Sequence, residues 1–276
     1  ALLRLGGALQ RLHRFDEARA VWIHAAAELP GHELLRHEAE LARAYYPCCD
    51  AKTAECGGPS APKMALGGRK DTIYRLSQGR EVWLSAAPLL PAADCARIVE
   101  LCEAHAAISG GWSTKRHTTV PTTDMEVRAV DEVRRLFNAA CEHTLFPFLE
   151  RAYASAPGLR ATAARLRVSD AFVVRYDAKA QRSLPTHQDD SHLSLTIALN
   201  GTSEYEGGGT SFEDLSAEGG GPVRPEIGHV VAFPGSLRHG GAPLKRGVRY
   251  IIAAFLWVSE EGGANGGHAA SENGGS

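Results

Sequence analysis

Alternation of large and small side chains predicts a β-strand over residues 193–199, because successive side chains of a strand point to opposite faces. One face carries the large apolar side chains, Leu193, Leu195, Ile197 and Leu199. The other face carries the small ones, Ser194, Thr196 and Ala198. Small side chains suit the inside of a barrel that holds a cofactor, with the bulky face packed outward on helices. An ordinary half-buried strand would show the same alternation, so the pattern by itself leaves both interpretations open.

Longer apolar runs predict further elements. Residues 248–258 are apolar on both faces around a single Arg249, which predicts a strand buried on both sides. Residues 91–107 and 129–141 repeat apolar side chains at helical spacing, so we expect an amphipathic helix over each range. Pro147 predicts a break soon after the second of these helices.

The N-terminal segment follows a different apolar pattern. Apolar and small residues recur there as in two antiparallel helices closed by a proline, at Leu2, Leu5, Gly6, Leu9, Phe15, Ala18, Trp22, Ala25 and Pro30. The spacing resembles one tetratricopeptide repeat, and residues 32–46 resemble a following helix in weaker agreement. One such unit does not bury its own apolar face. We therefore expect a fragment of a longer array or a repeat docked on the rest of the chain, with a plain helical hairpin as the alternative.

Composition adds only a few constraints. A chain of 276 residues is long enough for one sizeable core and a smaller unit. The net charge of −2 gives no case for nucleic-acid or membrane-surface binding. No apolar run of about 18 residues predicts a membrane span. Residues 47–70 have the composition of a linker, and residues 262–276 that of a disordered glycine-rich tail.

The six cysteines fall into two groups. One group lies in the predicted linker, where disulfides would depend on an oxidising compartment: Cys48, Cys49 and Cys56. The other group has poor spacing for zinc and is most simply a set of small core residues: Cys95, Cys102 and Cys141.

Three residues form a candidate metal site. In an extended strand, side chains at i and i+2 point the same way, so His187 and Asp189 would bind one ion from one strand. His239, from a distant strand, would supply the third ligand. Two imidazoles and one carboxylate on one face of a metal match the facial triad of non-heme Fe(II) oxygenases, which leaves the opposite face open. Asp190 has the wrong parity to share this face, and His192 lies past the predicted strand end, so we exclude both.

Arg249 predicts an anionic ligand. A guanidinium in a strand buried on both sides needs an anion, because an unpaired buried charge is strongly unfavourable. The distal carboxylate of 2-oxoglutarate fits, since guanidinium and carboxylate match as a two-pronged hydrogen-bonded pair.

The motifs around these residues resemble a known family. They read Leu-Pro-Thr-His-Gln-Asp, Leu-Ser-Leu-Thr-Ile-Ala-Leu-Asn, Tyr-Glu-Gly-Gly-Gly-Thr-Ser-Phe, Gly-His-Val-Val-Ala-Phe-Pro-Gly-Ser-Leu-Arg-His-Gly-Gly and Gly-Val-Arg-Tyr-Ile. In this order, residues 172–258 resemble the catalytic core of the Fe(II)/2-oxoglutarate dioxygenases, in the branch of prolyl 4-hydroxylases and procollagen lysyl hydroxylases. The resemblance implies that His187, Asp189 and His239 bind iron and that Arg249 anchors 2-oxoglutarate. Arg at the anchor is typical of the lysyl hydroxylase-like branch, whereas many prolyl hydroxylases use Lys.

The same resemblance suggests further contacts. Thr210 follows a glycine-rich turn as does the family's threonine that contacts 2-oxoglutarate, although the glycines alone are more typical of an ordinary hairpin. Tyr176 is either a core residue or the tyrosine that bonds the 2-oxoglutarate carboxylate. Many members carry a tyrosine just before the first histidine, where this chain has Leu184. Related halogenases lack the carboxylate ligand, so Asp189 favours hydroxylation.

Together these features predict an α+β protein with four parts. A tetratricopeptide-like segment at 1–46 and a linker at 47–70 would precede a double-stranded β-helix (jelly-roll, cupin-like) domain at 71–260, with a disordered tail at 261–276. The predicted helices would support one side of the barrel. A polar loop over residues 111–124 would be either a substrate-side loop or a connector.

By the resemblance, the enzyme would use Fe(II), 2-oxoglutarate and O2 to hydroxylate a C–H bond of a peptidyl proline or lysine, releasing succinate and CO2. The resemblance also implies ascorbate as a reductant that restores oxidised iron, and allows a location in the endoplasmic reticulum. Two alternatives stay open. One is an interaction protein whose repeat recruits a protein partner and whose dioxygenase domain is degenerate, and the other is a small-molecule dioxygenase.

Overall fold

The computed structural model describes residues 2–11, 15–32, 35–36, 39, 70–114, 116–117, 120–156 and 159–259. The linker predicted at 47–70, apart from its last residue, lies outside these ranges. So do the cysteines at 48, 49 and 56, the tail at 261–276 and most of the helix expected over 32–46. Among the described helices, none is both long and apolar enough to cross a bilayer.

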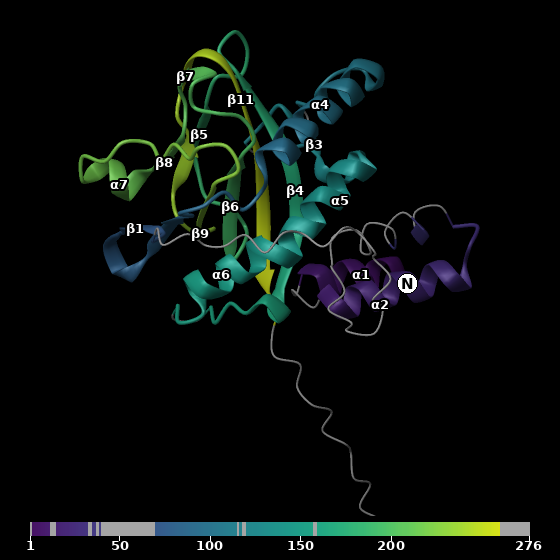
Figure 1. The fold of residues 1–276 in the computed structure, drawn as a ribbon. Coiled ribbons are helices and arrows are strands. Elements are labelled where there is room, and N and C mark those ends of the chain that lie inside the picture. Colours follow the sequence, from purple (N-terminus) through teal and green to yellow (C-terminus); the bar gives the residue numbers. More distant parts are fainter. Residues whose placement is uncertain are drawn as a thin grey trace, which may run out of the picture.

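Two antiparallel sheets form the main body (Figure 1). The larger has eight strands, in the order β1 (Thr72–Arg75), β2 (Glu81–Leu84), β9 (Val230–Pro234), β6 (Leu193–Ala198), β11 (Leu244–Val258), β4 (Leu166–Asp177) and β3 (Asp124–Glu126), with β7 (Tyr205–Gly207) paired to β11. The smaller contains β5 (Leu184–His187), β10 (His239–Gly241) and β8 (Thr210–Phe212). This mixed architecture of helices and antiparallel sheets is of the jelly-roll type that the sequence predicts.

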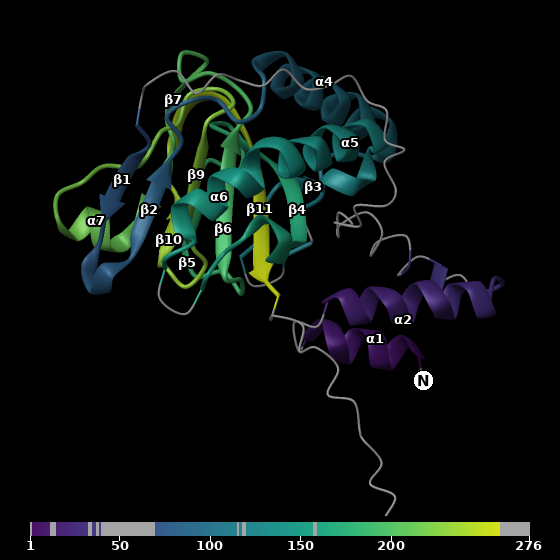
Figure 2. The ribbon, with the colours of Figure 1, turned by 60° about the horizontal axis from the view of Figure 1, so that its bottom comes forward.

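Helices cover one face of the larger sheet (Figure 2). They are α4 (Ala92–Ser109), α5 (Asp131–Ala140) and α6 (Phe146–Tyr153). Shorter helical turns are η1 (Ser77–Gly79), η2 (Val127–Ala129), η4 (Ala163–Arg165) and α7 (Glu213–Ala217). Both predicted amphipathic helices are therefore confirmed, and Cys95, Cys102 and Cys141 are free and buried as expected of core residues.

The break expected at Pro147 is wrong. Helix α5 continues through one wide π-helical turn, η3 (Cys141–Leu145), directly into α6. In this turn the Phe146 N–H donates to the Cys141 carbonyl, five residues back rather than four. Pro147 lies at the start of α6, so the N–H that proline lacks falls directly after the widened turn, where the regular pattern of helical hydrogen bonds is already interrupted.

Strand β6 confirms the alternation read from the sequence. Its large side chains, with Leu199 beyond the strand end, belong to the same buried core as residues of α4, α5 and α6. Ser194 and Thr196, on the opposite face, line a cavity between the two sheets. Burial of the apolar face on helices is what directs the small face inward.

The N-terminal segment forms two helices, α1 (Leu2–Arg11) and α2 (Phe15–Glu28), that lie side by side (Figure 2). Trp22 packs under Gly6, where an added Cβ would lie 2.2 Å from the indole nitrogen. Leu9, Ala18, Ala25, Leu35 and Ala39 belong to the same small core, and Trp257 of β11 joins it. The helical pair is confirmed, while its assignment to a tetratricopeptide repeat stays a prediction.

Candidate metal centre and its cavity

A cavity of about 410 Å³ lies between the two sheets. Residues of β5, β8 and β10 line one side, and residues of β4, β6 and β11 line the other. Along β11 the inward positions are Arg249, Ile251, Ala253 and Phe255, each two residues apart. The cavity therefore follows the strand direction, and Arg249 and Phe255 mark its two ends.

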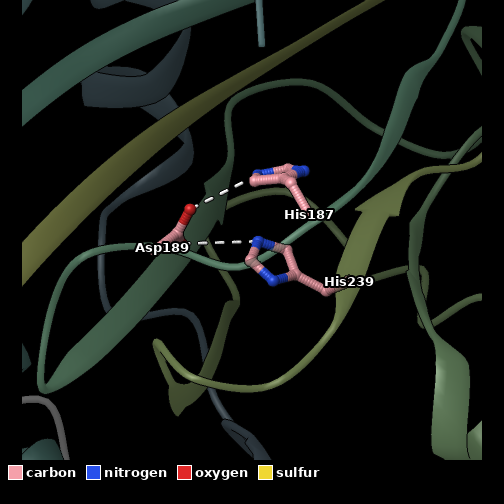
Figure 3. Close-up of side chains that lie close together, drawn as sticks. All are labelled: His187, Asp189 and His239. Carbon is pink, nitrogen blue, oxygen red and sulfur yellow. Dashed lines mark ion pairs between the residues drawn. The ribbon is translucent and has the colours of Figure 1, made fainter. Parts of the chain in front are cut away.

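His187, Asp189 and His239 meet at the wall formed by the smaller sheet (Figure 3). His187 ends β5 and His239 begins β10, and the two residues are direct partners in the antiparallel register. One potential ligand atom from each of the three residues lies within 4.8 Å of the others. His187 Nε2 is 3.3 Å from Asp189 Oδ1, and His239 Nε2 is 3.4 Å from Asp189 Oδ2. This grouping could hold one metal ion.

Backbone contacts orient both imidazoles. His187 Nδ1 lies 2.8 Å from the Pro185 carbonyl oxygen, and His239 Nδ1 lies 2.9 Å from that of Leu237. A carbonyl only accepts, so each Nδ1 carries the proton and donates it. In the neutral imidazole Nε2 then keeps its lone pair, which is the form in which histidine binds a metal.

Asp189 is not part of strand β5, which corrects the basis on which it was predicted. The strand ends at His187, and Asp189 lies two residues beyond it in a loop. The Asp189 N–H donates to the Gly235 carbonyl at 2.9 Å, which holds the loop against the end of β9. The carboxylate still points toward both imidazoles (Figure 3). Tertiary hydrogen bonding, rather than strand alternation, places this side chain.

Asp190 and His192, which were excluded as metal ligands from the sequence, lie outside the group of three ligands. Asp190 is exposed at the cavity wall and is not among the described residues that group around a possible metal. His192 packs its ring on Trp257, with centroids 4.4 Å apart, and its Nδ1 accepts the Val258 N–H. Neither residue is in the possible metal-ligand group of the described chain, although the strand parity used to exclude Asp190 does not apply in a loop.

The charges of the three residues suit a divalent cation. Burial acts to raise the pKa of Asp189, but contacts with His187, His239 and Ser194 outweigh it and lower that pKa. Burial lowers the pKa of His239, which favours its neutral form. Burial acts on His187 in the same direction, although its contact with Asp189 raises the pKa overall. The carboxylate is thus ionised next to at least one neutral imidazole.

Arg249 lies at the end of the cavity formed by Tyr176 and Thr210. It is 2% exposed, and its Nε and Nη2 are buried with no hydrogen-bond partner among the described residues. Its Cζ lies 5.5 Å from the centre of the Tyr176 ring, directly across the register of β11 and β4. A buried guanidinium in this state is strongly unfavourable unless an anion joins it.

Tyr176 and Thr210 are both buried and both line the cavity. Burial raises the pKa of Tyr176, so its hydroxyl keeps its proton. The glycines at 207–209, just before Thr210, do not form the ordinary hairpin that their sequence suggested. The strands on either side of them do not pair with each other, because β7 pairs with β11 while β8 pairs with β10. Gly208 instead has φ +68°, and a Cβ there would lie 3.2 Å from Arg249 Cδ. Glycine at this position leaves room for the arginine.

Thr196 is a candidate site residue that the sequence analysis did not single out. Its Oγ1 is buried without a hydrogen-bond partner among the described residues, and the side chain lines the cavity. Its place on the small face of β6 was the available signal. That signal marked it as inward-facing but could not show that its hydroxyl lacks a partner.

Four residues of the polar stretch between 111 and 124 line the other end of the cavity, namely Arg116, His117, Val120 and Thr122. Whether this stretch is a substrate-side loop or a connector stays a prediction. Arg116 and His117 lie against Phe172, with the Arg116 Cζ 5.1 Å and the His117 ring 4.6 Å from the ring centre. Arg116 also pairs with Asp124 at 3.1 Å and with Asp170 at 2.8 Å. Unlike Arg249, this arginine has its charge compensated within the protein.

Comparison with known proteins gives relatives but no family model, since none matches the chain. The chain is 31% identical over 182 residues to procollagen-lysine,2-oxoglutarate 5-dioxygenase 1 of Gallus gallus. It is 32% identical over 184 residues to the multifunctional procollagen lysine hydroxylase and glycosyltransferase LH3 of Rattus norvegicus. Each match covers 61% of this chain but only 23% and 22%, respectively, of the relative. The chain thus spans less than a quarter of these relatives.

Among solved structures, the chain is similar to the viral collagen prolyl hydroxylase of Paramecium Bursaria Chlorella virus-1, with a TM-score of 0.46 and 16% identity. That match covers 71% of this chain and 99% of the viral one.

Proposed function

We propose that this chain is an Fe(II)- and 2-oxoglutarate-dependent dioxygenase that hydroxylates a C–H bond of a peptidyl lysine or proline and releases succinate and CO2. The observation that carries the proposal is the buried, unpartnered guanidinium of Arg249 in the same cavity as the cluster of two histidines and one carboxylate. Either feature alone is open to a structural explanation. Together they are the features that a bound metal and a co-substrate with a carboxylate for Arg249 would need.

The names of the relatives support the same chemistry. The Gallus gallus relative is named for 2-oxoglutarate and for a lysine of procollagen, which favours a peptidyl lysine among the candidate substrates. Within this proposal the two facing sheets form a double-stranded β-helix, with helices α4 to α6 as its support.

Each residue would have a defined task. Iron would be held by His187, Asp189 and His239 through the atoms that face one another in the cavity. The far carboxylate of 2-oxoglutarate would accept hydrogen bonds from Arg249. When bound, the iron and the keto acid supply the oxidising chemistry that O2 drives.

The remaining residues would bind and orient. The Tyr176 hydroxyl and Thr210 would complete the co-substrate end. The Thr196 hydroxyl, which is paired in register with Ala253, would face the space between that end and the metal ligands. The apolar lining at Ile251 and Ala253 would limit water in the space between the anchor and a bound metal. The substrate residue would enter past the metal toward Phe172 and Phe255, where the cavity wall is aromatic.

Ascorbate as a reductant and a location in the endoplasmic reticulum belong to the proposal by resemblance. The four-part division of the chain at 1–46, 47–70, 71–260 and 261–276 is likewise proposed. The α1–α2 pair favours one alternative, in which a tetratricopeptide-like segment recruits a protein partner and the second domain is degenerate. A small-molecule 2-oxoglutarate dioxygenase is the other alternative.

The decisive experiment supplies the purified protein with Fe(II), 2-oxoglutarate and a library of lysine- and proline-containing peptides in air. We expect succinate to form together with a peptide that has gained the mass of one oxygen atom. Controls omit 2-oxoglutarate or O2. Absence of succinate from protein that has bound Fe(II) would contradict the enzyme and favour the interaction protein. Succinate with no oxidised peptide would favour the small-molecule enzyme.

A further inference from the structure

The carboxylate of Asp189 has a hydroxyl partner that a three-ligand description leaves out. Ser194 Oγ donates to Asp189 Oδ2 at 2.6 Å. Ser194 is 2% exposed and lies in β6, a strand whose residues are all buried. We infer that Ser194 is a positioning residue that holds the Asp189 carboxylate in the orientation in which it meets a metal ion. This inference rests on the proposed function, because it concerns the same site.

The two oxygens of Asp189 have different surroundings. Oδ1 lies 3.3 Å from His187 Nε2, while Oδ2 lies 3.4 Å from His239 Nε2 and also accepts the Ser194 proton. A hydrogen bond to an ionised acceptor is short and strong, so it opposes rotation of the carboxylate about its terminal bond. Ser194 therefore favours ligation through one oxygen at a fixed rotation. A carboxylate that instead used both oxygens would occupy a position that the keto acid or O2 needs.

Ser191 extends this contact by one step. Its Oγ lies 2.9 Å from Ser194 Oγ, and either hydroxyl could donate to the other on distance alone. An ionised carboxylate has no proton to give, so Ser194 must donate to Asp189 and has no second proton for Ser191. Ser191 is therefore the donor to Ser194. The order Ser191 to Ser194 to Asp189 is the only one that uses both hydroxyl protons within this chain of contacts.

The loop that carries Asp189 and Ser191 is itself anchored. Asp189 N–H donates to the Gly235 carbonyl at 2.9 Å, and Gly235 N–H donates to the His192 carbonyl at 3.3 Å. A Cβ on Gly235 would lie 2.3 Å from Ser191 Oγ, so only glycine allows this close approach. Gly235 also begins the turn that leads to His239. The hydroxyl pair thus connects the buried strand β6 to a loop fixed beside the second histidine.

The test measures metal affinity rather than turnover. Co(II) serves as the probe in titrations without O2 or 2-oxoglutarate, and its absorption spectrum reports the ligand field. We expect Ser194→Ala to weaken Co(II) binding by about 10–100-fold, the range for losing a residue that orients a metal ligand. Its Co(II) spectrum should also change. Ser191→Ala should weaken binding by less, because the Ser194 donation to Asp189 survives.

Two further variants separate orientation from packing. Ser194→Thr keeps the hydroxyl and should restore affinity and spectrum. Ser169→Ala is the matched control, because Ser169 also has a hydroxyl hydrogen bond, to the Phe255 carbonyl at 3.2 Å, yet contacts no ligand residue. It should bind Co(II) like the wild type. If Ser194→Ala does not fold, the graded loss in Ser191→Ala and the recovery in Ser194→Thr still decide the question.

Three results would overturn the inference. They are wild-type affinity in Ser194→Ala, failure of Ser194→Thr to restore a lost affinity, and an equal loss in Ser169→Ala. A wild-type protein that takes up no Co(II) at all would instead contradict the proposed function. The two failures are therefore distinguishable.

Discussion

The two arginines that line the cavity differ in how their charge is compensated. Arg249 is 2% exposed and has two nitrogens without any hydrogen-bond partner among the described residues. Arg116, 19% exposed in its side chain, pairs with Asp124, Glu126 and Asp170. Both lie close to an aromatic ring, Tyr176 and Phe172 respectively.

This difference separates a binding residue from a structural one. Arg116 is satisfied by the protein, so its burial needs no ligand. Two nitrogens of Arg249 have no hydrogen-bond partner among the described residues, so this buried charge is unfavourable unless other interactions offset it or an anion binds it. Residue type, cavity and aromatic contact are shared between the two. The presence of carboxylate partners around Arg116, and their absence around Arg249 among the described residues, distinguishes the structural arginine from the binding one.

The largest expected effect is the loss of turnover when a metal ligand, located between the two arginines, is removed. His187→Ala, Asp189→Ala and His239→Ala should each abolish iron-dependent 2-oxoglutarate turnover, because a facial triad has no spare ligand. Succinate release and bound Fe(II) are the measurements. Asp190→Ala, which removes the adjacent carboxylate, should leave both nearly unchanged. Full turnover in any of the three variants would exclude that residue as a metal ligand. An inactive Asp190→Ala together with an active Asp189→Ala would show that Asp190, not Asp189, is the carboxylate ligand.

Arg249→Ala should raise the 2-oxoglutarate requirement more than tenfold, since losing one partner of a desolvated charged pair costs roughly 2–5 kcal/mol. Fe(II) affinity should change far less. Arg249→Lys should recover part of the loss, because Lys keeps the charge but not the two-pronged geometry. Removing Lys245 or Arg246, both exposed, should matter little. Titration of 2-oxoglutarate into each variant gives the answer, and unchanged affinity in Arg249→Ala would contradict the anchor.

Arg116→Ala should have the opposite effect to Arg249→Ala, because it should lower the stability of the protein. It leaves the fully buried Asp124 without its cationic partner, so the free energy of unfolding should fall by roughly 2 kcal/mol. This is less than for a wholly buried pair, because Arg116 is partly exposed and Thr122 still donates to Asp124. Urea unfolding of ligand-free protein measures the change. Arg249→Ala should not destabilise the ligand-free protein, and a larger loss there than in Arg116→Ala would reverse the assignment of the two roles.

The smallest effect concerns pH and Asp124. Burial raises the pKa of its carboxyl, while Thr122 and Arg116 act to lower it. A carboxyl with a raised pKa in the folded state binds more protons when folded than when unfolded. Its contribution to stability is therefore fully present below the ordinary carboxyl pKa and is lost as pH rises through the raised value. The difference in unfolding free energy between wild type and Asp124→Asn should therefore shrink as pH rises across this range, and a difference that does not change with pH would contradict the assignment.

Much of the candidate site could be predicted from local sequence. His187, Asp189, His239 and Arg249 were recognisable because metal ligands and a buried cation are unusual residue types inside apolar or glycine-rich motifs. The inward face of β6 followed from alternation alone, since strand geometry has a period of two. The helical break at Pro147 was wrong because a local rule ignored the wide turn that tertiary packing permits. The hairpin at Gly207 to Gly209 was wrong for a similar reason, as its strands pair elsewhere.

The sequence by itself determined which chemical groups are present and which face of β6 points inward, because these depend on residue identity and on near neighbours. Only the tertiary structure decided which groups meet. The register that pairs His187 with His239, the loop contact that turns Asp189 toward them, and the absence of described partners for Arg249 and the Thr196 hydroxyl all arise between distant segments. Whether a buried polar group is satisfied depends on every segment packed around it, and local patterns do not contain that information.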